Sequence, residues 1–276
     1  MGETKKVENM TYFELLAWLG IGSSHPGGFF TTKQTLDTIQ IKSEDYVLDA
    51  GCGSGLTTCY LAKTTGSRII GVDINPLMID KAFQRAEKER VSHLVDFKVA
   101  DVYSLPFAEN FFDWVITESV TVFLDKVNVF REFYRVLKPK GQVADLEMTL
   151  LKELPTNLQK QLKEYYGSGT DPVSIEEWCN SLSRAGFEGV EIKNPQLLKT
   201  DNLVASELKR DWLLYKDLDD KIKKQPGLLP RLQRSADFIK KNQSYVGFGL
   251  LYGRKPVATP TKFVLKEWLR KKTFRK

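Results

Sequence analysis

Cysteine and histidine are scarce in this chain of 276 residues, which holds three cysteines and two histidines. The cysteines form no C-x-x-C pair, and no cysteine–histidine cluster has the spacing of a zinc site. The sequence therefore excludes a disulfide framework, and we expect no metal site. We predict a cytoplasmic protein with reduced thiols, in which Cys52 and Cys59 are small packing residues.

Long apolar runs and phosphate loops are absent as well. The apolar stretch Phe13–Gly22 is interrupted by Glu14 and is too short for a signal core or a membrane span. Lys6 stands where an N-terminal myristoylation signal needs serine or threonine. Because no G-x-x-x-x-G-K-S/T loop occurs, we do not expect cleavage of a nucleoside triphosphate.

Positive charge is concentrated at one end of the chain. Residues 254–276 contain nine Lys or Arg against the single Glu267, a net charge of +8, whereas the whole chain carries +6. The rest is nearly neutral, at −2, unlike a uniformly basic nucleic-acid-binding domain. Phe263 and Trp268 interleave with the basic residues of this tail. Such a helix could lie on an anionic membrane, but we favour docking on the protein's own domain.

The body of the chain alternates between apolar strands and amphipathic helices. Strands are predicted at 45–50, 68–73, 94–100, 112–117 and 141–148, with helices near 56–64, 76–90 and 125–138 between them. This spacing predicts a parallel sheet built by helical crossover connections. Further along we expect helices at 150–166 and 175–185, the second capped by Ser174, and strands at 187–192 and 245–252.

The first predicted strand runs into three glycines at alternate positions, in Gly51-Cys-Gly-Ser-Gly55. Glycine lacks a Cβ, so its backbone can turn sharply and approach a ligand closely. Asp73 ends the second strand and follows Gly51 by 22 residues, the distance at which a βαβ unit brings an acid to a ribose. Leu56 replaces the third glycine of an NAD-binding loop. The pattern indicates an adenosine-containing cofactor.

Four stretches, in order and correctly spaced, resemble the motifs of a known family: Asp49–Gly55, Gly71–Met78, Val99–Asp113 and Phe133–Gly141. They are similar to the motifs of class I S-adenosylmethionine-dependent methyltransferases, of the methyltransferase domain 11 type. The similarity is greatest to the branch of ubiquinone and menaquinone C-methyltransferases and small-molecule methyltransferases. Lys140 stands where this family commonly has glycine.

The resemblance implies an α/β fold with a Rossmann-like, seven-stranded, mostly parallel sheet whose last strand is antiparallel. Helices would cover both faces, with helical lid insertions. We expect four parts: an N-terminal helical lid at 1–40, a cofactor-binding core at 41–194 and 244–255, a helical insertion that caps the substrate at 195–243, and the basic amphipathic tail at 256–276.

The resemblance also implies how the cofactor, S-adenosylmethionine, would be held and released as S-adenosylhomocysteine. Its methionine part would contact Asp49 and the glycine loop, through Gly51, Cys52, Gly53 and Gly55. Asp73 would accept both ribose hydroxyls. Asp49 could instead be a carboxylate that stabilises the turn, though a buried acid at a strand end needs a partner.

The adenine would lie on the next part of the chain. Ile74 and Met78 would pack on the ring, and Asp101 would bind its exocyclic amine, with the Val102 amide nearby. Asp101 could alternatively cap a loop, but its position within a matching motif favours a cofactor contact.

Two residues are candidates for catalysis. Glu118, at the end of the fourth strand, would lie beneath the sulfonium and face the acceptor; it could be a base, a cofactor contact or a solvated loop residue. His25 lies in a His-Pro-Gly-Gly loop, where such enzymes often fold a lid over the cofactor. It could act as a base or simply bond a neighbouring backbone group. The sulfonium already activates the methyl group, so the protein need only supply alignment, dehydration and sometimes a base.

Three functions remain for comparison. We favour a methyltransferase acting on a small-molecule or peptide acceptor. A nucleic-acid methyltransferase is prompted by the pI near 9.0, but Thr117–Val120 lacks the Asn/Asp-Pro-Pro-aromatic motif of base-methylating enzymes. A non-catalytic protein that senses the cofactor is least favoured, because none of the motifs is degraded.

Overall fold

The computed structural model describes residues 7–10, 15, 18–19, 28–166, 171–197, 221 and 223–257. The strands are β1 (Tyr46–Ala50), β2 (Arg68–Asp73), β3 (Val95–Val99), β4 (Phe112–Glu118), β5 (Leu137–Leu150), β6 (Val173–Ser174), β7 (Glu188–Leu197) and β8 (Val246–Arg254). The helices are η1 (Val7–Asn9), α2 (Gly28–Leu36), α3 (Leu56–Thr65), α4 (Pro76–Lys88), η2 (Thr121–Phe123), α5 (Lys126–Val136), α6 (Thr156–Tyr166), α7 (Ile175–Ala185) and α10 (Leu228–Asn242).

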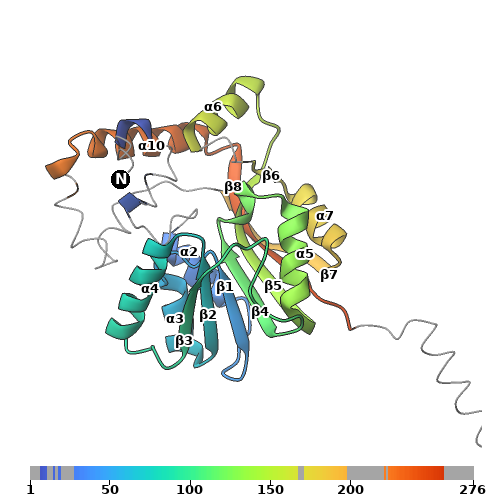
Figure 1. Cartoon of the computed structure of the whole chain (residues 1–276). Coiled ribbons are helices and arrows are strands. Elements are labelled where there is room, and N and C mark those ends of the chain that lie inside the picture. The colour runs from blue at the N-terminus through green and yellow to red at the C-terminus, as the bar shows by residue number, and fades with distance from the viewer. Residues whose placement is uncertain are drawn as a thin grey trace, which may run out of the picture.

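The strands form one sheet in the order β3-β2-β1-β4-β5-β8-β7, with β6 paired to β5 (Figure 1). The first five strands of this order are parallel, and β8 is antiparallel to both of its neighbours. The predicted Rossmann-like sheet with an antiparallel last strand is confirmed. The described residues contain eight strands rather than seven, because the two-residue β6 adds to the edge of β5.

The central strands are buried on both faces. Leu48, Val115 and Val143 enter an apolar cluster with α5 and α7. Val47 and Trp114, which point the opposite way, pack with α3 and α4. A strand covered on both sides is apolar along its whole length, which is why the sequence located these strands closely. The order of strands reverses beside β1, and open α/β sheets bind ligands at the carboxyl ends of the strands at such a reversal.

A third apolar cluster joins the sheet to a helical layer. Met148 of β5 and Phe248 of β8 pack with η1, α6 and α10, which lie beyond one end of the sheet in Figure 1. Arg231 of α10 donates a hydrogen bond to Met10 O at 3.2 Å and so ties two parts of this layer together. The predicted lid at 1–40 and cap at 195–243 contain η1, α2 and α10, but their boundaries stay predictions. Residues 258–276 of the predicted tail lie outside the described residues.

Element boundaries differ from the prediction at α6, β7 and Pro139. The helix expected at 150–166 begins only at Thr156, because β5 continues to Leu150, and the strand expected at 187–192 extends to Leu197 as β7. The remaining difference lies at Pro139. Helix α5 ends at Val136 and β5 begins at Leu137, four residues before the predicted strand. Proline cannot continue a helix, and it pushes the preceding residue towards extended conformations. The chain therefore becomes extended early, and Leu137 already pairs with Phe112 of β4. None of the described helices is long and apolar enough to cross a bilayer.

Candidate functional site

The glycine loop after β1 has a backbone that glycine adopts far more readily than other residues. Gly51, Gly53 and Gly55 have φ angles of +82°, +51° and +74°. The amides of Gly51 and Cys52 both donate to Val72 O, at 2.7 and 2.9 Å, which ties the loop to β2. A Cβ added to Gly51 would overlap Cγ2 of Val120, a residue that follows β4. The loop is thus held between the ends of β2 and β4.

Asp73, the last residue of β2, is bonded directly to this loop. Its Oδ2 accepts a hydrogen bond from Gly53 N at 3.0 Å, and its Oδ1 accepts one from Asn75 N at 2.8 Å. Burial raises the pKa of the Asp73 carboxyl, and these two backbone donors oppose the shift. Each carboxylate oxygen has two lone pairs, so both oxygens can still accept a hydrogen bond from a ligand hydroxyl.

Asp49 lies buried at the end of β1. Thr58 in the first turn of α3 donates a hydrogen bond from Oγ1 to Asp49 Oδ2 at 2.5 Å. Burial raises the pKa of Asp49 to about 7; the Thr58 bond opposes this, and the nearby Glu118 and Asp73 carboxylates add to it. A cation placed beside Asp49 would favour the charged carboxylate.

Glu118 ends β4 on the same face of the sheet as Asp49, because Asp49 pairs with Ile116, two residues earlier. Its Oε2 accepts a hydrogen bond from Thr57 Oγ1 at 2.8 Å. Three of the predicted site residues, Asp49, Asp73 and Glu118, therefore end three neighbouring strands around the glycine loop. The resulting negative charge suits a ligand that carries positive charge.

The predicted adenine-binding residues follow β2 and β3. Ile74 is 70% exposed, whereas Met78 and Val102 are buried. Asp101 Oδ1 accepts a hydrogen bond from Tyr103 N at 2.9 Å, which is the loop-capping alternative considered above. That bond leaves the second carboxylate oxygen as an acceptor for a ligand. An isoleucine this exposed directly after β2 leaves an apolar surface that a flat ring could cover.

Sequence reasoning missed the residues that hold the site in place. Thr57 and Thr58 were not singled out, although each bonds one of the predicted carboxylates. Arg85 is fully buried in α4 and donates from Nε to Ser54 O, inside the glycine loop, at 2.9 Å. A charged residue on the apolar side of an amphipathic helix was the available signal, because it needs a fixed partner. His25, the other predicted catalytic residue, lies outside the described residues.

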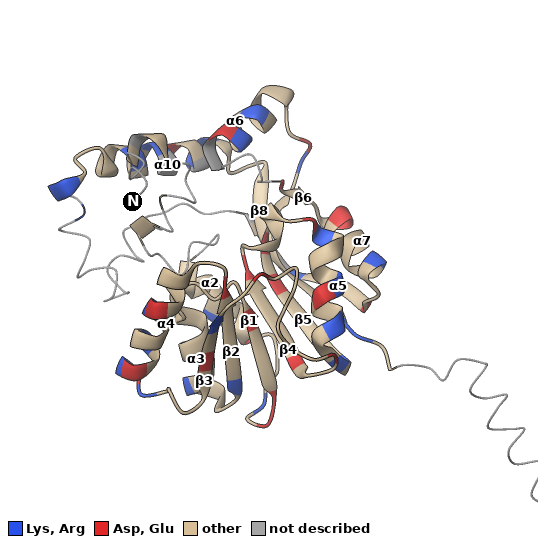
Figure 2. Ribbon diagram, viewed as in Figure 1, with Lys and Arg blue, Asp and Glu red and all other residues tan. Residues whose placement is uncertain are grey.

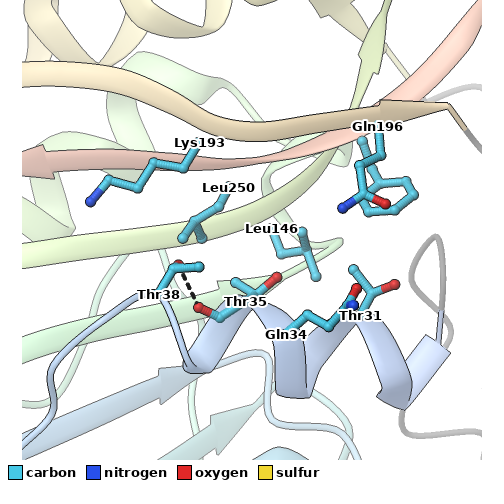
Figure 3. Close-up of a pocket in the computed structure, with 9 residues that line it drawn as sticks. Thr31, Gln34, Thr35, Thr38, Leu146, Lys193, Gln196 and Leu250 are labelled. Atoms are coloured by element: carbon cyan, nitrogen blue, oxygen red, sulfur yellow. Dashed lines mark hydrogen bonds between the residues drawn. The ribbon is translucent and has the colours of Figure 1, made fainter.

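A pocket between α2 and the strands does not coincide with these residues (Figure 3). One wall is formed in and directly after α2, by Thr31, Gln34, Thr35 and Thr38. The other is formed by the sheet, through Leu146, Lys193, Gln196, Phe248 and Leu250. The cavity volume is about 20 Å³, enough for a water molecule and far too small for a cofactor. This pocket is therefore not a candidate for a cofactor site.

Comparison with known proteins identifies the class. A family profile described as a methyltransferase domain matches residues 48–144. The uncharacterized methyltransferase YodH of Bacillus subtilis is 33% identical over 180 residues, which cover 65% of this chain and 76% of that protein. Phosphoethanolamine N-methyltransferase 1 of Triticum aestivum is 38% identical over 184 residues, which cover 65% of this chain and 36% of the wheat protein.

A solved structure shares the fold. It is phosphoethanolamine N-methyltransferase 2 of Haemonchus contortus, in complex with phosphomonomethylethanolamine and S-adenosylhomocysteine. The TM-score is 0.69 at 21% identity, and the match covers 88% of this chain and 56% of the other. The chain thus spans about a third to a half of the length of the phosphoethanolamine enzymes that it matches.

The fold and the strand ends define an α/β protein with an adenosine-cofactor site. With the profile match and its relatives, the chain belongs to the class I S-adenosylmethionine-dependent methyltransferases. Solved structures of the same fold hold S-adenosylhomocysteine or S-adenosyl-L-methionine, from which the family takes its name. The residues fit S-adenosylmethionine, because a loop with glycine at alternate positions bonds a carboxylate at the end of β2 and further carboxylates nearby can face positive charge.

We predict that Gly51→Ala disrupts the site and that Gly66→Ala is a matched control. Both glycines have positive φ, +82° and +72°, so either substitution should cost about 1 to 2 kcal/mol of backbone strain. Only the Gly51 substitution adds a clash, with Val120; a Cβ on Gly66 meets Ser43 at an ordinary 3.7 Å. Urea unfolding and calorimetric titration with S-adenosylhomocysteine should show a larger loss of stability and a loss of affinity for Gly51→Ala alone. Equal behaviour of the two variants would contradict this account of the loop.

Proposed function

We propose that this protein transfers the methyl group of S-adenosylmethionine to a small-molecule or peptide acceptor by in-line displacement. The observation that carries the proposal is the hydrogen bond between Gly53 N and Asp73, which joins the glycine loop to the acid expected to hold the ribose. Relatives named for phosphoethanolamine support an acceptor of small size.

The bound cofactor supplies an electrophilic methyl group on a positively charged sulfur. In this proposal Asp49 binds the positive end of the methionine part, and the Gly51, Cys52, Gly53 and Gly55 backbone lies along it. Asp73 accepts the ribose hydroxyls with the lone pairs that Gly53 and Asn75 leave unused. Ile74 and Met78 contact the adenine, while Asp101 and Val102 bind its amine.

Glu118 is proposed to face the acceptor from the end of β4. Its carboxylate can attract a cationic acceptor or take the proton that an N–H or O–H acceptor loses as the new bond to carbon forms. His25 is proposed as a second group for this proton transfer. The apolar cluster that joins η1, α6 and α10 to β5 and β8 supports a covered site, which excludes water and suits an acceptor of limited size.

We expect Asp73→Ala to weaken cofactor binding about 100-fold, since it removes charge-assisted hydrogen bonds worth about 1.5 to 3 kcal/mol each. Asp96→Ala is the control, because Asp96 is an exposed acid on the neighbouring strand β3. Among the described contacts it accepts a hydrogen bond only from the amide of the next residue, Phe97, and pairs with Lys98. Calorimetry with S-adenosylmethionine measures both affinities, and circular dichroism checks the fold. An unchanged affinity of folded Asp73→Ala would refute the assigned site.

Cofactor affinity should also depend on pH through Asp49. With a pKa of about 7 in the free protein, Asp49 is mostly neutral at pH 5.5 and must lose its proton to hold a cation. Affinity for S-adenosylmethionine should therefore rise about tenfold between about pH 5.5 and 7, where the ligand's amino group stays protonated. Asp49→Asn, which keeps an oxygen for Thr58, should bind more weakly and with a flatter pH profile. A slope identical to that of the wild type would exclude Asp49 as its source.

A second candidate is a nucleic-acid acceptor, favoured by the charge of the cap. Residues 221–244 contain seven Lys or Arg and one Asp, and parts of the α10 ribbon are blue in Figure 2. Part of this charge is used inside the protein, however. Lys221 donates to Trp18 O and Leu19 O, both at 3.0 Å, and Arg231 donates to Met10 O. We therefore rank this candidate second.

A salt titration separates the two candidates. Binding that neutralises six or more phosphates weakens roughly 1,000-fold between about 50 and 200 mM salt. We expect only weak, salt-sensitive binding of tRNA and no methylation of it, together with turnover of a small acceptor found in a screen of amines, phosphobases, thiols and isoprenoids. Methylated tRNA, formed without turnover of any small acceptor, would reverse the ranking.

A further inference from the structure

Two fully buried acids, Asp145 and Glu147, have no role in the proposed function. They stand at alternate positions of β5 and so point to the same face of the sheet. Asp145 pairs with Thr117 of β4 and with Leu251 of β8, deep in the sheet. Burying two carboxylates side by side is costly unless hydrogen bonds and protonation compensate their charges.

A single hydroxyl joins the two acids. Thr121 Oγ1, in η2, lies 2.5 Å from Asp145 Oδ2 and 3.1 Å from Glu147 Oε1. A threonine hydroxyl has one hydrogen and can donate it to only one of the two. Both hydrogen bonds are made only if the other carboxyl carries a proton and donates it to the threonine oxygen. The geometry therefore requires one shared proton for the pair.

The other contacts show which acid holds this proton. Glu147 accepts hydrogen bonds from two backbone amides, Val122 N at Oε1 and Met148 N at Oε2, both at 3.1 Å. Such donors favour the charged carboxylate. Among the described residues, Asp145 has no backbone donor, and its buried Oδ1 has no hydrogen-bond partner. The proton belongs on Asp145.

Surrounding charges agree with this assignment. Burial raises the pKa of Asp145 well above its ordinary value, and the charges of Glu147 and then Glu118 add to the shift, while Lys126 of α5 opposes it. Lys126 is shared, because its Nζ also lies 4.0 Å from Asp171 Oδ2. Burial raises the pKa of Glu147 to about 7, against the hydrogen bonds from Val122, Met148 and Thr121.

This arrangement reaches the cofactor loop through four residues. Ser119 has a φ of +54°, a strained backbone for serine, and its amide donates to Leu146 O at 3.0 Å. Val120 comes next, and its side chain fills the space over Gly51 that a Cβ would need. The hydroxyl of Thr121 and the amide of Val122 are the two groups of this segment that bind the acid pair. The position of Val120 against the loop thus depends on bonds made by the two residues after it.

We propose that Asp145 carries a proton at neutral pH, and that the hydrogen-bond chain from Asp145 through Thr121 to Glu147 positions residues 119–122 against the cofactor loop. In this chain Asp145 Oδ2 donates to Thr121 Oγ1, and Thr121 Oγ1 donates to Glu147 Oε1. Thr121 is a positioning residue that touches neither cofactor nor acceptor. The inference rests on the cofactor site proposed above.

Substitution of Thr121 tests the positioning role. Thr121→Val keeps the shape but removes the hydroxyl, whereas Thr121→Ser keeps it. Thr149→Val is the matched control, because it also replaces a buried threonine by valine. Thr149 lies on the face of β5 that carries Asp145 and Glu147, but its Oγ1 donates to Val173 O at 3.1 Å and not to residues 119–122. Calorimetry should show affinity for S-adenosylhomocysteine about tenfold weaker in Thr121→Val and close to that of the wild type in the other two. Urea unfolding checks that Thr121→Val and Thr149→Val lose similar stability. The proposal would be overturned if Thr121→Val bound S-adenosylhomocysteine as tightly as the wild type, or if the two valine variants lost affinity equally.

Substitution of the acids tests where the proton lies. Asp145→Asn keeps a neutral group whose amide can donate to Thr121, so its affinity should stay within about twofold of the wild type. Glu147→Gln turns amide hydrogens towards the Val122 or Met148 donors, so affinity should fall about tenfold. At pH 7 the infrared C=O band of buried protonated carboxylic acids should lose intensity in Asp145→Asn. Asp49 and Glu147, each with a pKa of about 7, contribute the part of the band that remains.

The infrared result does not depend on cofactor binding or on Glu147→Gln folding. A band of unchanged intensity in Asp145→Asn, or tolerance of Glu147→Gln together with loss of affinity in Asp145→Asn, would overturn the assignment. A wild-type protein that binds no S-adenosylmethionine would refute the proposed function and leave the infrared test of Asp145 intact.

Discussion

The close packing of Gly51 between β2 and β4 is the constraint on which the cofactor site depends. Its amide and that of Cys52 share the single acceptor Val72 O, and Val120 occupies the space where a side chain would be. Gly53 can then reach Asp73 from a left-handed backbone. A loop that turned more loosely would separate the Asp73 carboxylate from the amides beside it. The backbone of the glycine loop therefore determines where the acid proposed to bind the ribose can lie.

The strands and the acids at their ends could be predicted from the sequence for a physical reason. Strands buried on both faces show as continuous apolar runs, and the end of such a run followed by alternate glycines marks a strand end with an exposed backbone. The positions of Asp49, Asp73 and Glu118 at strand ends follow from those runs alone. Parallel order brings strand ends to one edge of a sheet, so the three acids were expected to gather there.

The partners of these acids could not be read in the same way. Thr58 lies nine residues from Asp49, and Thr57 lies 61 residues from Glu118, so neither pairing follows from local periodicity. Arg85 reaches Ser54 only because α4 packs beside α3. Such contacts depend on how helices are placed on the sheet, which propensity and spacing leave open. The early start of β5 is a different case. The helix was expected to end at residue 138 and the strand to begin only at Gly141, although the rule about the residue before a proline already favours an extended backbone at Lys138.

The sequence Ala144-Asp-Leu-Glu-Met148 carries a further lesson about buried strands. Its acids alternate with apolar residues, which is the usual pattern of a strand with one face in water. Both faces of β5 are nevertheless buried, and the acids point into the protein. A polar residue buried in such a strand needs a compensating contact for the protein to fold, and exceptions of this kind are concentrated at functional sites. Here the compensation comes from Thr121 and Val122, directly after the residue that packs on Gly51. The two faces of the sheet are therefore linked at the glycine loop. Asp49 lies beside the loop on one face, and on the other face Asp145 and Glu147 bind the segment 119–122 that packs against the loop.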